Sequence, residues 1–269
     1  MVEMRGKQVL ITGAARGIGL ATAGFFADAG SRLVITDRDE EELAQAAEQV
    51  RRRGSEVTAQ VVDVTDQQAV EALAAELEEK NRSPDVLINN AGVGHHGSLA
   101  STSIETWRRL IEVNLMGALY HIYAFLPAMR RRGSGHIVNI SSGQAYFKLP
   151  TWGAYSAVKA ALGSMSETLH FELRRWGIWV TTVYPFLART AFYDNVEARS
   201  TGARLSMKVL PYTADSPEKV GRLIFEAVRK RKRVERINLI NDLGFISQVV
   251  PGMLPLVCRA ADAVLSEKE

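Results

Sequence analysis

Apolar and polar positions alternate along the chain in two patterns that follow one another repeatedly. Short, nearly continuous apolar runs are typical of strands buried on both faces of a sheet, and the segments between them carry apolar residues at helical spacing. The expected strands are residues 8–13, 32–37, 56–64, 85–92, 136–142, 179–185 and 233–240, and the expected helices are 19–30, 39–54, 66–81, 103–132, 153–176 and 216–230. Strands that alternate with helices predict a parallel sheet with helices on both faces. We therefore predict an α/β fold, a doubly wound Rossmann fold with a seven-stranded parallel sheet.

The alternation stops at two places. Residues 186–214 are aromatic at first and then polar, and a loop of this length in a compact domain is usually a functional lid or disordered. Residues 241–269 hold an apolar stretch broken by prolines and an expected final helix. Because no linker separates the elements, we interpret residues 1–269 as one domain, with 186–214 as a substrate lid and 241–269 as a C-terminal extension.

Composition narrows the function classes. The single cysteine, Cys258, excludes an intramolecular disulfide framework, and no apolar N-terminal segment predicts a secretory signal, so we expect a cytoplasmic location. The net charge of +3 is concentrated at 51–53, 130–132 and 229–233, which we interpret as solvated helix ends. No motif typical of nucleic-acid binding accompanies these clusters, so no nucleic-acid partner is expected. No apolar run reaches the roughly 20 residues that span a bilayer.

Glycines cluster between the first expected strand and the first expected helix, in TGAARGIG at 12–19. Gly13, Gly17 and Gly19 allow a tight turn and a close approach of the backbone to a ligand. The helix start that follows presents free amides and the positive end of the helix dipole, which suit a pyrophosphate. The lysine and the hydroxyl residue of a nucleoside-triphosphate loop are missing, which argues against an ATPase.

Asp37 ends the second expected strand. A carboxylate there can accept hydrogen bonds from both ribose hydroxyls of NAD, and it repels the additional phosphate of NADP. Arg16 and Arg38 flank the same position and could hold a 2′-phosphate. We favour NAD(H), because the carboxylate repels a doubly charged phosphate more than two flexible arginines attract it, and NADP(H) is the alternative.

Six motifs follow one another in a fixed order: TGAARGIG at 12–19, DV at 63–64, NNAG at 89–92, VN at 113–114, ISS at 140–142 and YSAVK at 155–159. With these motifs the chain resembles the classical short-chain dehydrogenases/reductases over residues 5 to about 190. The resemblance implies a nicotinamide-dependent oxidoreductase that acts on an alcohol or a carbonyl group. It also implies that subunits pair into a homodimer or a homotetramer.

Tyr155 and Lys159 lie four residues apart in an expected helix and therefore share one face. Hydride transfer at a carbonyl carbon requires a proton at the oxygen, and a free tyrosine, with a pKa of about 10, is a poor base at neutral pH. We expect the Lys159 ammonium to lower the pKa of Tyr155 toward the working range. The resemblance implies that Lys159 also binds the nicotinamide ribose, that Ser142 holds the substrate oxygen and that Asn114 positions a proton-relay water. Ser141 is the weaker candidate, because neighbouring side chains of a strand point to opposite faces.

The resemblance and the position along the chain assign further residues to the two ligands. Those expected to contact the dinucleotide are Gly13, Arg16, Gly17, Ile18, Gly19, Asp37, Arg38, Asp63, Val64, Asn90, Ala91, Gly92, Tyr155, Lys159, Pro185 and Thr190. Those expected to line the substrate pocket are His95, Gln144, Trp152, Phe186 and Phe192. No metal site is expected, because the adjacent histidines His95 and His96 point apart and no carboxylate or cysteine cluster joins them.

Two departures from the family pattern bear on the substrate. Many members have Pro-Gly after the sixth strand, where this chain has Pro185-Phe186, and this indicates a narrower, more apolar site. The extension 241–269 replaces a familiar glycine-pair terminus, and together with FLPAM at 125–129 it resembles the hydroxysteroid and retinol dehydrogenase branch. The expected substrate is therefore a small lipophilic secondary alcohol or ketone.

The sequence allows alternatives for the position of the extension 241–269 and for the function. The extension could pack over the substrate pocket or a partner subunit, or it could make a peripheral membrane contact together with the basic segment 229–233. The alternative function is a catalytically weak cofactor-binding regulator or a membrane-recruited lipid-binding scaffold.

Overall fold

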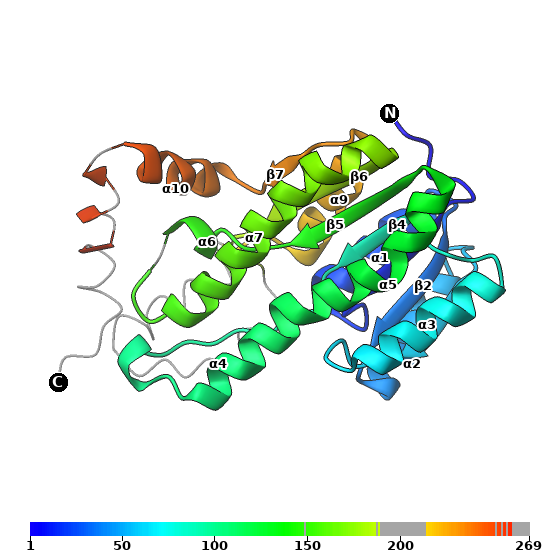
Figure 1. Ribbon diagram of the computed structural model, residues 1–269, viewed down its shortest axis with the longest axis horizontal. Helices are drawn as coiled ribbons and strands as arrows, with labels where there is room; N and C mark the ends of the chain where they lie inside the picture. The colour runs from blue at the N-terminus through cyan, green and yellow to red at the C-terminus, as the bar shows by residue number, and fades with distance from the viewer. Residues whose placement is uncertain are drawn as a thin grey trace.

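Figure 1 shows the computed structural model, which describes residues 1–147, 149–186, 188, 214–250, 252–253, 255–256 and 258–259. Seven strands form one sheet in the order β3-β2-β1-β4-β5-β6-β7. They are β1 (Gln8–Thr12), β2 (Arg32–Asp37), β3 (Val57–Val61), β4 (Val86–Asn89), β5 (Gly135–Ile140), β6 (Ile178–Tyr184) and β7 (Val234–Arg236). All neighbouring pairs are parallel, so the carboxyl ends of the strands meet at one edge. The strand order reverses between β1 and β4, where such folds bind ligands, and the predicted Rossmann fold is confirmed.

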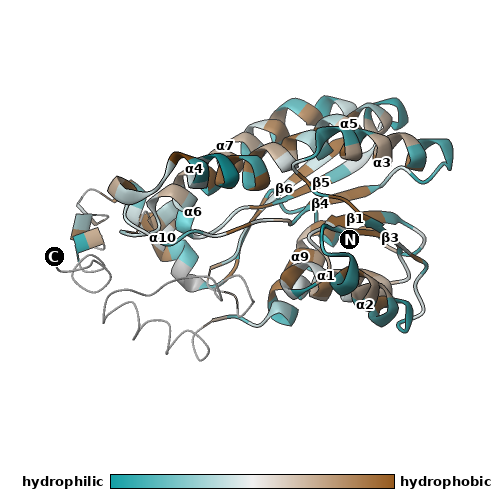
Figure 2. Ribbon diagram, turned by 90° about the horizontal axis from the view of Figure 1, so that it is seen from below, coloured by the Kyte–Doolittle hydropathy of each residue, from teal (hydrophilic) through white to brown (hydrophobic). Residues whose placement is uncertain are grey.

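Helices cover both faces of the sheet (Figure 2). One layer holds α1 (Gly17–Asp28), α2 (Glu40–Arg51) and α9 (Pro217–Arg229), and the other holds α3 (Gln67–Glu79), α5 (Gly117–Arg132) and α7 (Gly153–Leu173). Along β1, Val9 and Ile11 belong to the core under the first layer, whereas Leu10 belongs to the core under the second. Because both faces of the strands are buried, the strands are nearly continuous apolar runs rather than alternating ones.

Several helices begin at a side chain that caps the backbone. Asp39, Asp66, Ser103 and Ser216 each accept a hydrogen bond from the backbone N–H three residues later. Each such cap stabilises the helix start by about 1 kcal/mol. The caps explain why the polar residues between the apolar runs mark the helix starts.

The stretch expected as one long helix, 103–132, has three consecutive parts. It consists of α4 (Ile104–Ile111), a π-helical turn, η2 (Glu112–Met116), and α5. Among the described residues, Ile104–Arg132 is the one stretch long and apolar enough to cross a bilayer, judged by length and composition alone. Its Ile122 and Phe125 pack into the core under the sheet, as a core helix of a globular fold does. Asn114 and His121 interrupt the apolar run, which is why the sequence alone did not indicate it.

The last strand and the extension differ from the sequence-based expectation. The prediction of a strand to residue 240 is wrong, because β7 ends at Arg236 and the helix α10 (Leu239–Val249) begins three residues later. Asn238 has a φ of 75° and caps α10 by accepting from the N–H of Asn241, which turns the chain out of the sheet. The predicted lid, 186–214, falls almost wholly outside the described residues. The division into one domain with a lid and an extension stays a prediction.

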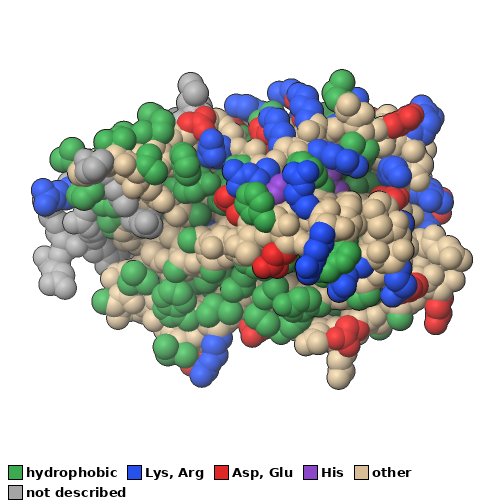
Figure 3. Space-filling view, turned by 45° about the horizontal axis from the view of Figure 1, so that its top comes forward, with side chains coloured by type: hydrophobic (Ala, Val, Ile, Leu, Met, Phe, Trp, Pro, Cys, Tyr) green, Lys and Arg blue, Asp and Glu red, His purple; other side chains and the backbone are tan. Residues whose placement is uncertain are grey.

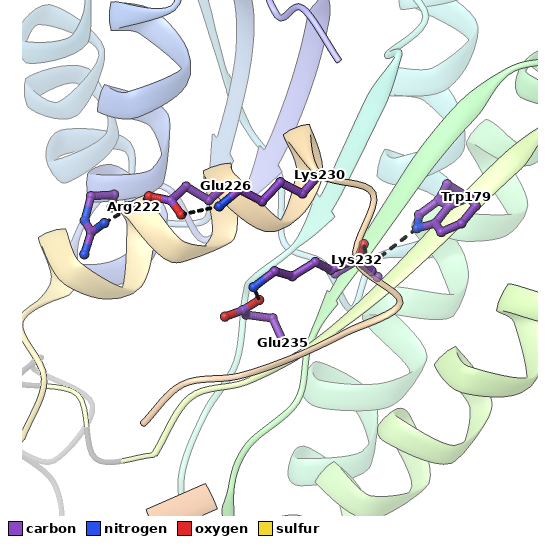
Figure 4. A network of polar contacts seen from close by, with 7 residues as sticks. Trp179, Arg222, Glu226, Lys230, Lys232 and Glu235 are labelled. Atoms are coloured by element: carbon purple, nitrogen blue, oxygen red, sulfur yellow. Dashed lines mark hydrogen bonds and ion pairs between the residues drawn. The ribbon is translucent and has the colours of Figure 1, made fainter. Parts of the chain in front are cut away.

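The basic segment 229–233 follows the end of α9 (Figure 4). Lys230 pairs with Glu226, and Lys232 pairs with Glu235. The indole N–H of Trp179 donates to the backbone carbonyl of Lys232, which ties the segment to β6. These contacts, and the basic residues in the last turns of α2, α5 and α9, agree with the interpretation of the clusters as helix ends.

Candidate active site

The glycine-rich turn after β1 forms a cradle that only glycine can build. Gly13 and Gly17 have φ values of 63° and 57°, in the region that side chains disfavour. A Cβ on Gly13 would lie 2.7 Å from the Cα of Ala91. The turn then opens onto the N-terminus of α1, where free backbone N–H groups suit a phosphate.

Thr12 and Asn90 lock the cradle against the end of β4. The Thr12 hydroxyl accepts from the backbone N–H groups of Asn90 and Ala91, each at 3.0 Å. The Asn90 side-chain amide donates back to the carbonyls of Thr12 and Gly13, at 3.0 and 2.9 Å. No role was expected for Thr12 from the sequence, although a hydroxyl residue at the end of a strand that enters a glycine turn is a signal that could have indicated it.

A cavity of about 220 Å³ lies over this cradle. It is lined by Gly13, Arg16, Gly17, Ile18, Asp37, Arg38, Val62, Asp63, Val64, Asn90, Ala91, Gly92, Val93 and Val113. Most residues assigned to the dinucleotide from the sequence therefore face one cavity at the carboxyl edge of the sheet. Val62 and Val93 are additions that lie outside the quoted motifs, and Val113 belongs to the VN motif but was not assigned to the dinucleotide.

Two carboxylates at the cavity are fixed by the backbone. One oxygen of Asp37 accepts from the N–H of Ala15 at 3.2 Å, and the other accepts from the N–H groups of Arg38 and Asp39, at 2.8 and 3.3 Å. Asp63, which follows the end of β3, accepts from the N–H and the hydroxyl of Thr65. Both carboxylates are therefore held in one orientation.

The four predicted catalytic residues lie close together beyond the cavity. Tyr155 and Lys159 are buried on α7, and Ser142 follows β5. Ser142 forms a side-chain hydrogen bond with Tyr155, and the Lys159 Nζ lies 5.9 Å from the centre of the Tyr155 ring. A Cβ on Gly92 would lie 2.8 Å from the Asn114 Oδ1 and 3.4 Å from the Lys159 Nζ, so this glycine leaves room for both.

Asn114 is held by the π-helical turn η2. Its side-chain N–H donates to the carbonyls of Val93 and Leu110, each at 3.0 Å, and its oxygen accepts from the N–H of Val93 at 3.2 Å. Turns of this kind are frequent at functional sites. The amide thus ties the helix that carries it to the loop after β4.

Burial sets the ionisation of Tyr155 and Lys159. Burial raises the pKa of Tyr155 to about 12, although the hydrogen bond from Ser142 opposes the rise. Burial lowers the pKa of Lys159 to about 7. The prediction that Lys159 lowers the pKa of Tyr155 is wrong for the polypeptide on its own, because removal of both groups from water favours their neutral forms.

The two serines of the ISS motif have different partners. The Ser141 hydroxyl donates to the backbone carbonyl of Lys159 at 2.7 Å, whereas the Ser142 hydroxyl accepts from the N–H of Gln144 and contacts Tyr155. The Lys159 Nζ donates to the carbonyl of Ile140 at 2.9 Å. Ser141 therefore anchors α7 to β5, and Ser142 faces the tyrosine.

Aromatic residues surround the expected substrate side. Trp152 packs edge-on against Tyr155, with ring centres 6.0 Å apart, and Phe186 packs against Phe147 at 5.0 Å. Gln144 is buried in α6 (Gln144–Phe147), and Pro185 accepts from the N–H of Gly143. Phe147 is an additional aromatic residue on this side that no motif indicated.

Three candidates from the sequence remain, His95, Thr190 and Phe192. His95 contacts the hydroxyl of Thr102, and burial lowers its pKa. Thr190 and Phe192 lie outside the described residues. In the described part of the chain, no group of three His, Cys, Asp or Glu side chains is placed to hold a metal ion.

The described part of the extension packs behind the active-site loop. Gln248 of α10 donates to the carbonyl of Tyr146, and the buried side-chain amide of Asn241 donates to the carbonyls of Tyr184 and Ile237. Gly244 lies against the ring of Phe147. The outer face of α10 carries exposed apolar residues, and on the face seen in Figure 3 hydrophobic side chains are frequent at the left and along the lower middle, whereas most Lys and Arg side chains lie at the upper right.

Comparisons with known proteins agree with this geometry. A family model described as short chain dehydrogenase matches residues 7–201. The probable oxidoreductase EphD of Mycobacterium tuberculosis is 36% identical over 262 residues, which cover 93% of this chain but 44% of that longer protein. A short-chain dehydrogenase/reductase of Burkholderia phymatum, solved in complex with NAD, is 30% identical with a TM-score of 0.81, and the match covers 100% of this chain and 99% of that one. L-sorbose reductase of Gluconobacter frateurii, solved with NADPH and L-sorbose, is 26% identical with a TM-score of 0.77, and the match covers 88% and 97% of the two chains.

Proposed function

The chain belongs to the short-chain dehydrogenase family, and from this premise we propose that it interconverts a lipophilic secondary alcohol and its ketone with a nicotinamide dinucleotide. The observation that carries the proposal is the meeting of Ser142, Tyr155 and Lys159 beside the glycine cradle. A regulator without turnover would not need a buried tyrosine and lysine at this position, because burial of ionisable groups is costly.

The cradle fits a dinucleotide. A Cβ at Gly13 would collide with the backbone of Ala91, so the close approach of these two segments requires glycine. The start of α1 offers free amides to a pyrophosphate. Asp37 would bind the ribose hydroxyls, and Asp63 with Val64 would border the adenine. When bound, the nicotinamide would accept or supply the hydride.

Tyr155 is the proposed acid and base. With a pKa of about 12 it is protonated at neutral pH, so it can donate a hydrogen bond, and finally its proton, to the oxygen of a ketone. In the reverse direction its phenolate form, which becomes populated as the pH rises toward that pKa, takes the proton of the alcohol. Ser142 would hold the same oxygen from a second side, and burial makes both hydrogen bonds stronger than they would be in water.

Lys159 and Asn114 are proposed to support this transfer. The Lys159 ammonium, with a pKa of about 7, can pass between charged and neutral forms near neutral pH, and it would bind the nicotinamide ribose. Asn114 would position a water that relays protons between Lys159 and solvent. Its amide is fixed by three hydrogen bonds, so it can hold such a water without ordering cost at the moment of reaction.

The preference for NAD(H) over NADP(H) rests on Asp37. Its carboxylate is held by three backbone N–H groups, and it lines the cavity where a 2′-phosphate of NADP would lie. Fluorescence titration with NADH and NADPH tests this part. We expect tighter binding of NADH, and we expect Asp37→Ala to reduce the difference by about tenfold or more, which corresponds to about 1.4 kcal/mol. Tighter binding of NADPH by the unmodified chain would contradict the proposal.

The lipophilic substrate class is supported by the aromatic wall of Phe147, Trp152 and Phe186. Turnover of secondary alcohols of increasing apolar size tests it. We expect kcat/KM to rise with apolar area, and equal values for small polar and large apolar alcohols would speak against this class. The packing of α10 against α6 favours the position of the extension over the substrate side. A peripheral membrane contact and a homo-oligomeric state stay predictions.

A further inference from the structure

Arg16 stands at the mouth of the cradle. It is the N-cap residue of α1, and it lines the cavity together with Asp37 and Arg38. Its guanidinium Nη1 lies 3.2 Å from the Oε1 of Glu42, and the two form a salt bridge. Guanidinium groups bind phosphates well because their donors match the phosphate oxygens in pairs. A free Arg16 would therefore suit the 2′-phosphate that distinguishes NADP from NAD.

Glu42 reaches Arg16 from the first turn of α2. That helix begins directly after Asp39, its N-cap, and its first turn holds Glu40, Glu41 and Glu42. Glu42 does not line the cavity itself. It acts on the cavity only through the arginine that it binds and through its negative charge.

We propose that Glu42 is a specificity-determining residue that engages Arg16 and so withholds this arginine from a 2′-phosphate. The inference rests on the proposed function and adds a second carboxylate to Asp37 in the selection of NAD(H). An NADPH molecule that recruits Arg16 must first break the salt bridge with Glu42. NADH has no 2′-phosphate to draw the guanidinium of Arg16 away from Glu42, so its binding need not break the salt bridge.

Arg38 is a second arginine at the cavity, and it does not depend on Glu42. It lines the same cavity, and among the described residues it forms no salt bridge. Arg38 therefore remains available to a 2′-phosphate whether or not Glu42 is present. The action of Glu42 should pass through Arg16 alone.

The expected effect is moderate. The side chains of Arg16 and Glu42 are 64% and 39% exposed, and a salt bridge between exposed groups is worth at most about 1 kcal/mol. Release of Arg16 should therefore tighten NADPH binding about three- to fivefold. Screening by salt should reduce this gain, because both side chains are at least partly exposed to solvent.

Four variants test the proposal by fluorescence titration with NADPH and NADH. They are Glu42→Gln, Arg16→Gln, the double variant of both, and Glu48→Gln as the control. Glu48 lies on the same helix and pairs with Arg52, so its substitution changes the charge of the protein equally without touching the cavity. Arg16 and Glu48 are exposed and Glu42 is partly exposed, so the fold should be retained, and thermal unfolding of each variant checks this.

We expect Glu42→Gln to tighten NADPH binding about three- to fivefold and to leave NADH binding within about twofold. Glu48→Gln should change neither, and the double variant should lose the gain. An equal gain in Glu42→Gln and Glu48→Gln, or a gain that persists in the double variant, would overturn the role of Glu42 while the proposed function stands. Failure of the unmodified chain to bind either dinucleotide would instead overturn the proposed function and this inference with it.

Discussion

Two neighbouring serines give a sharp test of the site, because the structure assigns them different partners. Ser141 is 3% exposed and donates to the Lys159 carbonyl at 2.7 Å, whereas Ser142 contacts Tyr155. Ser141→Ala leaves a buried carbonyl without this donor, which should lower the free energy of unfolding by about 1–2 kcal/mol. Because no reacting atom is touched, we expect kcat/KM to fall by less than about tenfold.

Ser142→Ala removes a hydrogen bond that would strengthen as charge develops on the substrate oxygen. Loss of one such donor costs about 10²- to 10³-fold in turnover. It also removes the hydrogen bond that opposes the rise of the Tyr155 pKa, so the pH at which alcohol oxidation reaches its plateau should move upward in this variant only.

The two measurements are urea unfolding and the pH profile of kcat/KM, with an alcohol that the unmodified enzyme oxidises. The reasoning would be refuted if Ser141→Ala lost as much activity as Ser142→Ala, or if the pH profile moved equally in both variants.

Two further predictions concern mainly stability. Burial lowers the pKa of His136 to about 3 and of His121 to about 4, so their neutral forms stabilise the fold above pH 6.5, and this contribution is lost as the pH falls through the folded-state values. Between pH 6.5 and 4, each such histidine lowers the free energy of unfolding by at most about 1.4 kcal/mol for each pH unit that the pH falls. His136→Gln should therefore reduce this loss, and the measurement is urea unfolding at a series of pH values. An unchanged slope of the free energy of unfolding against pH would argue against this. Asn241→Ala removes two buried hydrogen bonds and the support behind Gly143, so it should lower the free energy of unfolding by about 2–3 kcal/mol and raise KM, and a variant as stable as the unmodified chain would contradict the role of α10.

Much of the fold could be predicted because buried parallel strands leave a strong pattern. Val9, Leu10 and Ile11 are all buried on β1, and such runs separated by capped helices specify the βαβ order. The end of the sheet could not be predicted in the same way. Residues 237–240 are as apolar as a strand, and only the positive φ and the cap at Asn238 turn them into a helix start.

The geometry of the candidate site was predictable where the backbone itself forms the cradle. Glycines in a turn indicate positive φ values, which Gly13 and Gly17 have. The carboxyl ends of β1 and β4 must meet because these strands are parallel neighbours. The ionisation of Tyr155 and Lys159 was not predictable, because spacing along a helix gives proximity but not burial. The salt bridge of Arg16 with Glu42 joins residues 26 positions apart, which no local pattern reveals.

The most direct measurement is turnover and dinucleotide binding by Tyr155→Phe, compared with Tyr123→Phe at an exposed position of α5. The central claim is that the Tyr155 hydroxyl transfers the proton. We predict that Tyr155→Phe loses about 10³-fold or more in kcat while it binds NADH within about twofold, and that Tyr123→Phe is unchanged. Retention of more than about a tenth of the turnover by Tyr155→Phe, with an intact fold, would contradict the account.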